Sequence, residues 1–79
     1  MENDEVQRLI EAGLPGCKAL VQGDGRHFEV IVTGEVFEGK SLLARQRLVN
    51  AAVNAHIASG ELHALSIKTY TPAEWSQVN

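Results

Sequence analysis

Hydrophobic residues near the start of the chain recur at the spacing of one helix face. They follow the i, i+3, i+4, i+7 pattern at Val6, Leu9, Ile10 and Gly13. This pattern predicts an amphipathic helix over residues 3–13, with Asn3 or Asp4 as its N-terminal cap. The helix is expected to end at the Leu-Pro-Gly segment 14–16, because proline cannot continue a helix and glycine tolerates the left-handed conformation at a helix end.

The following segments have the composition and the alternation of β-strands. Residues 28–33 are mostly β-branched or aromatic and predict a strand, and residues 17–22 predict another. The segment 23–26, Gly-Asp-Gly-Arg, is a turn signal, so the two strands are expected to form an antiparallel hairpin. Phe28, Val30 and Val32 share one face of the second strand, whereas Ile31 shares the other face with polar residues.

The longest apolar pattern predicts the main helix over residues 42–59. A loop over residues 34–40 precedes it, Ser41 is its expected N-cap, and Gly60 supplies the stop. Its apolar stripe consists of Leu42, Leu43, Leu48, Val49, Ala52, Val53 and Ile57.

A third strand over residues 62–69 and a short terminal helix complete the pattern. In the strand, His63 is expected on the same face as the inward residues Leu65, Ile67 and Thr69. The terminal helix begins with a capping box, in which Thr71 is the cap and Glu74 its partner. Trp75 is expected to lie over the sheet edge or the long helix. The resulting order is α, β, β, α, β, α, which favours an α+β fold with a small three-stranded sheet and helices packed on one face.

The length of 79 residues allows one domain, so residues 1–79 are interpreted as a single unit. One cysteine, Cys17, excludes an internal disulfide and a cysteine-based zinc site. No apolar run approaches the roughly 18 residues of a membrane span, and the first residues are acidic where a signal peptide is basic. We therefore expect a soluble, cytoplasmic protein without a membrane partner.

The net charge of −3 divides unevenly along the chain. Residues 39–60 contain Lys40, Arg45 and Arg47 and no acidic residue, whereas residues 1–11 contain four acidic residues and one basic residue. The basic segment begins like the second helix of a helix-turn-helix, a nucleic-acid-binding element, but a solvated helix face explains it equally well. The overall acidity argues against non-specific coating of nucleic acid.

No sequence motif of a common catalytic site is present, so we predict that the protein is not an enzyme. His27, His56, His63 and Cys17 are the side chains suited to bind borderline or soft metals, including the iron of iron–sulfur clusters. Each has an ordinary structural interpretation: Cys17 as a buried apolar residue, His56 as a helix-surface residue and His27 as a strand end. His63 is the hardest to explain in that way, because it opens an otherwise apolar strand face.

Three segments together make the sequence resemble the BolA family. They are VFEGKSLLARQRLVNAAV, LHALSIKTYTPAEW and, similar to the IbaG/YrbA-like bacterial branch, GDGRHFEV. The resemblance covers residues 4–76 and implies an α+β fold related to class II KH domains, in the order αββααβα. That order contains one further short helical turn, expected at residues 41–43 or at the end of the long helix.

The resemblance implies a non-enzymatic role in iron–sulfur cluster trafficking, iron homeostasis and the acid or stress response. Family members pair with monothiol glutaredoxins, and the two proteins share a 2Fe-2S cluster with glutathione supplied through the glutaredoxin. The family's histidine ligand corresponds to His63, and His27 is the available second ligand in the hairpin loop. Cys17 corresponds to no ligand position. Without the partner, the chain is expected to be a monomer or a weak homodimer.

The family is also associated with DNA-binding transcription regulation. In this chain that alternative would depend on Lys40, Arg45, Arg47 and Lys68. Many members have Arg-His-Arg where this chain has Arg45-Gln46-Arg47, so a role of that middle histidine is absent. The Gly-x-x-Gly loop by which KH domains hold a nucleic-acid backbone is not supplied by residues 34–37.

Overall fold

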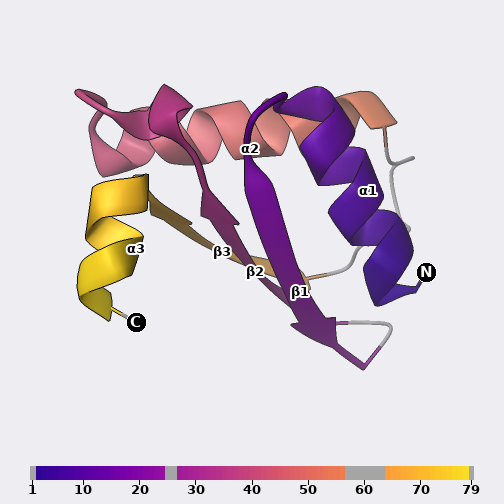
Figure 1. Cartoon of the computed structure of the whole chain (residues 1–79). Coiled ribbons are helices and arrows are strands. Elements are labelled where there is room, and N and C mark those ends of the chain that lie inside the picture. Colours follow the sequence, from indigo (N-terminus) through magenta and orange to yellow (C-terminus); the bar gives the residue numbers. More distant parts are fainter. Residues whose placement is uncertain (1, 25–26, 57–63, 79) are drawn as a thin grey trace.

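A three-stranded sheet in the order β1-β2-β3 forms one layer of the protein (Figure 1). The computed structural model describes residues 2–24, 27–56 and 64–78. Strand β1 spans Lys18–Gly23, β2 spans His27–Thr33 and β3 spans Ala64–Tyr70. β1 pairs antiparallel with β2, which confirms the predicted hairpin, and β3 pairs parallel with β2. The parallel pair requires a crossover connection, which the main helix provides.

Two helices, α1 (Asn3–Gly13) and α2 (Leu42–His56), pack against the same side of the sheet (Figure 1). The third helix, α3 (Pro72–Val78), follows directly from the end of β3. The alternation of β2 explains the packing, because Phe28, Val30 and Val32 are at most 2% exposed and all point toward the helices. The α+β architecture predicted from the sequence is confirmed.

The hydrophobic core lies between α1, α2 and the covered face of the sheet. Burial of each large apolar side chain contributes about 1.5–3 kcal/mol, so this layer supplies most of the favourable free energy of folding. The core residues are Val6, Ile10, Leu14, Cys17, Ala19, Phe28, Val30, Val32, Phe37, Val49, Ala52 and Val53.

The structure differs from the predictions at the starts of α1 and α2. Residues 41–43 form no separate turn. A 3₁₀ turn (η1) lies instead at Glu35–Phe37 and buries Phe37 completely. Its three residues are too few to show a helical periodicity, so the sequence predicted only a loop there. The alternative position at the end of the long helix lies outside the described residues. Helix α1 is capped by the backbone carbonyl of Glu2, with no side-chain cap.

The apolar stripe of α2 also begins later than predicted. Leu42 and Leu43 are 70% and 61% exposed, whereas Val49, Ala52 and Val53 are buried. The first turn of α2 therefore lies beyond the core, and only its later turns pack on the sheet.

The predicted caps of the two later helices are present. The Ser41 hydroxyl accepts a hydrogen bond from the backbone N–H of Ala44 at 3.2 Å. Thr71 and Glu74 form the reciprocal capping box: the N–H of Glu74 donates to the Thr71 hydroxyl at 3.1 Å, and the N–H of Thr71 donates to the Glu74 carboxylate at 2.8 Å. This box fixes the start of α3 relative to β3.

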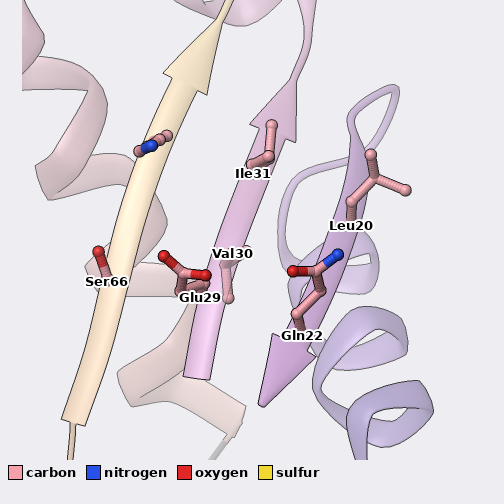
Figure 2. Close-up of a pocket in the computed structure, with 7 residues that line it drawn as sticks. Leu20, Gln22, Glu29, Val30, Ile31 and Ser66 are labelled. Atoms are coloured by element: carbon pink, nitrogen blue, oxygen red, sulfur yellow. The ribbon is translucent and has the colours of Figure 1, made fainter. Parts of the chain in front are cut away.

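The face of the sheet opposite α1 and α2 is open. Figure 2 shows side chains of all three strands on this side, around a hollow of about 110 Å³. Leu20 is 54% exposed there, and Lys68 belongs to the same face because its neighbours Ile67 and Thr69 point to the core side. The other residues that line the hollow are Gln22, Glu29, Val30, Ile31 and Ser66.

A side chain of α1 accepts a hydrogen bond from a backbone N–H at the outer edge of β1. The amide N–H of Ala19 donates to the Glu11 carboxylate at 3.0 Å, so this group does not point toward β2. Unpaired groups on an edge strand are where another chain can add a strand. Glu11 therefore shields part of this edge while it holds α1 against β1.

Gly34 packs so closely on Cys17 that a Cβ atom at this position would overlap the cysteine sulfur. Its φ of −173° is extended backbone that any residue adopts, so a substitution would fail for steric reasons alone. We expect Gly34→Ala to lower the free energy of unfolding by about 1–3 kcal/mol, the usual cost of overpacking, as measured by urea unfolding.

A double-mutant cycle tests the cause of this destabilisation. Cys17→Ala removes the sulfur that the new methyl group would meet, so Gly34→Ala should cost less in the Cys17→Ala background than in the wild type. Additive costs of the two substitutions would show that the predicted clash does not occur.

None of the described helices is both long and apolar enough to cross a membrane.

Candidate functional site

His27 opens β2 next to the hairpin turn, and its side chain is 74% exposed. Asp24 stands at the other side of the turn. Its Oδ1 accepts a hydrogen bond from the backbone N–H of His27 at 2.9 Å, and its Oδ2 lies 4.0 Å from the imidazole Nδ1. The backbone of His27 is therefore fixed by a hydrogen bond, and its exposed imidazole lies near the Asp24 carboxylate.

The first residue of β3 lies opposite His27. The parallel register pairs His27 with Ala64. His63, which precedes Ala64 in the sequence, lies outside the described residues. The predicted position of the His63 side chain on the inward strand face is therefore untested, as is that of Leu65, whereas Ile67 and Thr69 face the core side as expected.

A hollow of about 630 Å³ borders His27 on the surface. Three of its residues, Gln22, Glu29 and Ser66, also line the smaller hollow on the open face of the sheet. Because β2 alternates, His27 and Glu29 point to this open face while Phe28 points to the core. The start of β2 is thus accessible from the side of the sheet opposite α1 and α2.

Cys17 is 7% exposed and packs in the core, which confirms its structural interpretation. Burial raises the pKa of its thiol above the ordinary value of 9.0, because the interior disfavours the charged thiolate. The thiolate is the form that binds metals, so the surroundings of Cys17 oppose a ligand role. Among the residues that the structure describes, no three His, Cys, Asp or Glu side chains are grouped so as to hold a metal ion.

The predicted phosphate contact at Arg45 needs correction, since its side chain points inward and is only 9% exposed. Its guanidinium forms a fork with the Glu74 carboxylate, at 2.7 Å from Nη1 to Oε1 and 3.3 Å from Nη2 to Oε2. Its Nε donates to the backbone carbonyl of Lys40 at 3.0 Å. Arg45 therefore joins the starts of α2 and α3, and its charge is engaged within the protein.

The Arg45 hydrogen bonds hold the pKa of the Glu74 carboxyl below its ordinary value of 4.5. The bond from the Thr71 backbone acts in the same direction. Hydrogen bonds to the charged form of a carboxyl favour that form.

The other three predicted cations lie on two different surfaces. Lys40 and Arg47 border a hollow of about 320 Å³ at the start of α2. Lys68 lies on the open face of the sheet, opposite the side on which α2 packs. The four cations of the DNA-binding interpretation therefore do not form one patch.

Two residues that make side-chain hydrogen bonds had no predicted functional role. Asp24 was interpreted only as a turn residue. The side chain of an Asp in a turn commonly accepts a hydrogen bond from a backbone N–H that follows it, so this contact could have been expected. Gln46 donates from Nε2 to the carbonyl of Ile67 at 3.0 Å. No local signal reveals that contact, because the two residues are 21 positions apart.

The fold and this arrangement of residues were compared with known proteins. A sequence model of BolA-like proteins matches residues 9–74. The chain belongs to the BolA family. It is 44% identical over 77 residues to the acid stress protein IbaG of Escherichia coli strain K12, and the match covers 98% of this chain and 92% of IbaG.

Solved structures of BolA proteins have the same fold. A BolA homologue from Coxiella burnetii superposes with a TM-score of 0.87 at 40% identity, over 96% of this chain and 97% of that one. A BolA-like protein from Babesia bovis gives a TM-score of 0.80 at 32% identity, over 100% and 94% of the two chains. The family and the fold expected from the resemblance are both confirmed.

Proposed function

We propose that this BolA-family protein is a non-catalytic partner of a monothiol glutaredoxin, with which it shares a 2Fe-2S cluster. The observation that carries the proposal is the pairing of His27 with Ala64, the residue that follows His63 in the sequence. In this register His27 lies beside the first residue of β3, and the second predicted ligand precedes that residue in the sequence. Membership of the BolA family supports the same role.

The donor set of this chain fits a shared cluster. Neutral imidazole is a ligand for iron in clusters, and histidine in place of cysteine raises the reduction potential. His27 offers such an imidazole at the surface, where a partner can reach it. His63 is the second ligand in this proposal, and the cysteine of the glutaredoxin and the thiol of its glutathione complete the set.

The cellular role that we propose is cluster trafficking in the cytoplasm, linked to iron homeostasis and the response to acid stress. The name of the E. coli relative, acid stress protein, supports the last part. DNA binding is not our proposal, because Arg45 is engaged by Glu74 and Lys68 lies apart from Lys40 and Arg47.

The test is anaerobic reconstitution of the cluster with iron, sulfide and glutathione on an equimolar mixture of this chain and a monothiol glutaredoxin. We expect a heterodimer in size-exclusion chromatography that carries the cluster absorbance, with a visible circular dichroism spectrum different from that of the glutaredoxin alone. Separate elution of the two proteins with an unchanged glutaredoxin spectrum would refute the proposal.

A DNA titration provides the contrasting result. Phosphate contacts release counterions, so a DNA-binding protein loses affinity steeply as the salt concentration rises. Saturable binding of a promoter-length duplex with this salt dependence, reduced by Lys40→Ala with Arg47→Ala, would favour the regulator instead.

A further inference from the structure

The carboxylate of Asp24 accepts one hydrogen bond from His27 and lies near its ring. Oδ1 accepts the backbone N–H of His27 at 2.9 Å, and Oδ2 faces the ring nitrogen Nδ1 at 4.0 Å. The backbone bond fixes the position of the carboxylate relative to the strand start. A rotation of the exposed imidazole that shortens the second distance by about 1.2 Å produces a hydrogen bond from Nδ1–H.

A neutral imidazole carries its proton on only one of its two nitrogens. The hydrogen bond made by one nitrogen decides which of them keeps the proton, and the other nitrogen is then available as a metal ligand. Carboxylates commonly act in this way on metal-bound histidines, where they fix the tautomer and the orientation of the ring.

We propose that Asp24 is the positioning residue of His27: its carboxylate binds Nδ1–H and leaves Nε2 as the nitrogen that binds the cluster. This inference rests on the proposed function and extends it to a residue that was interpreted only as part of the turn.

Glu29 is the other carboxylate near the site and serves as a matched control. It belongs to the hollow beside His27 and lies two residues along the same strand face. The structure records no contact between its carboxylate and the His27 ring, whereas Asp24 faces that ring. Both control and test substitutions, Glu29→Gln and Asp24→Asn, remove one negative charge from the same hollow.

The stability of the fold should change little in these variants. The Asp24 and His27 side chains are 70% and 74% exposed, and ion pairs in water contribute little to stability. Asp24→Asn also retains an oxygen for the backbone bond of His27. A change at the imidazole can therefore be separated from unfolding.

The first measurement uses the chain without a cluster. Long-range ¹H–¹⁵N correlation spectra, recorded where imidazoles are neutral, report which ring nitrogen of His27 carries the proton. We expect the Nδ1–H form to predominate in the wild type and in Glu29→Gln, and to decrease in Asp24→Asn and further in Asp24→Ala. An identical tautomer ratio in all four proteins would overturn the inference.

The second measurement uses the complex with glutaredoxin. We expect Asp24→Asn to weaken formation of the cluster-bearing heterodimer by about tenfold, at the lower end of the usual effect of such residues, with Glu29→Gln unchanged. Equal affinity of the wild type and Asp24→Asn would refute the positioning role and leave the proposed function intact. Absence of a wild-type complex would refute the proposed function, and the tautomer ratios would still report on Asp24.

Discussion

Replacement of His63 by alanine is expected to abolish the visible circular dichroism signal of the shared cluster. In our proposal the His63 imidazole is a direct ligand, and alanine offers no atom that can replace it. Loss of residues that only orient a ligand already costs 10–100-fold in metal affinity, so loss of the ligand should reduce heterodimer formation by at least about tenfold. The measurement is a titration of the variant into cluster-loaded glutaredoxin, followed by visible circular dichroism.

The other two histidines supply the comparison. His27→Ala should have an equal or smaller effect than His63→Ala. His56→Ala should leave the spectrum unchanged, since no motif relates this residue to the cluster. Far-ultraviolet circular dichroism of each variant shows whether the fold is retained.

Two results would remove the ligand assignment. One is an unaltered visible spectrum in folded His63→Ala. The other is an equal loss of signal in His56→Ala, which would show that histidine replacement acts through something other than ligation.

The fold was predictable because its main elements carry their periodicity in short segments. Alternation in β2 placed Phe28, Val30 and Val32 on one face, and these are the residues that the helices cover. The capping box at Thr71 and Glu74 was predicted for a similar reason, since both partners lie within one helical turn. Patterns of this kind are complete within a few residues.

Features that depend on distant residues were missed. Arg45 has the sequence of a solvent-facing helix cation, and only the packing of α3 brings Glu74, 29 residues away, to its guanidinium. The exposure of Leu42 and Leu43 likewise depends on where α2 crosses the sheet, because an apolar stripe does not show how much of a helix is covered. The local sequence shows neither the contact between Arg45 and Glu74 nor the part of α2 that the sheet covers.

The candidate site combines both kinds of information. The hairpin turn and the strand start at His27 were visible in the sequence, and the contact from Asp24 lies within three residues. The pairing of His27 with Ala64 was not visible, because a parallel register between strands separated by a helix leaves no local signal. The pairing of the first residues of β2 and β3 is therefore information from the fold.

Acidification is expected to destabilise the protein through the Arg45–Glu74 pair. The pKa of Glu74 is lower in the folded protein than its ordinary value of 4.5, so the unfolded chain binds its proton more readily. The stability that results is fully present above about pH 4.5 and is lost as the pH falls through the lower folded value. Urea unfolding between about pH 7 and pH 3 should therefore show a falling free energy of unfolding over that acid range.

Two substitutions assign this acid-dependent loss to the pair. Glu74→Gln removes the titrating group, so its stability should be lower than that of the wild type at neutral pH and should fall less on acidification. Arg45→Met keeps an aliphatic side chain in the interior but removes hydrogen bonds to a charged group, and should cost about 2 kcal/mol at neutral pH. The free energy of unfolding of this variant should also fall less on acidification, because Glu74 then lacks the partner that lowers its pKa.

The matched control is Glu38→Gln, which removes an exposed carboxylate that forms no ion pair with any described residue. It should retain the wild-type dependence on pH. If the free energy of unfolding of Glu74→Gln and of Glu38→Gln falls on acidification as it does in the wild type, the acid destabilisation arises from other carboxyl groups. Arg45 would then hold the starts of α2 and α3 through packing and its bond to the Lys40 carbonyl, with no contribution from the charge of Glu74.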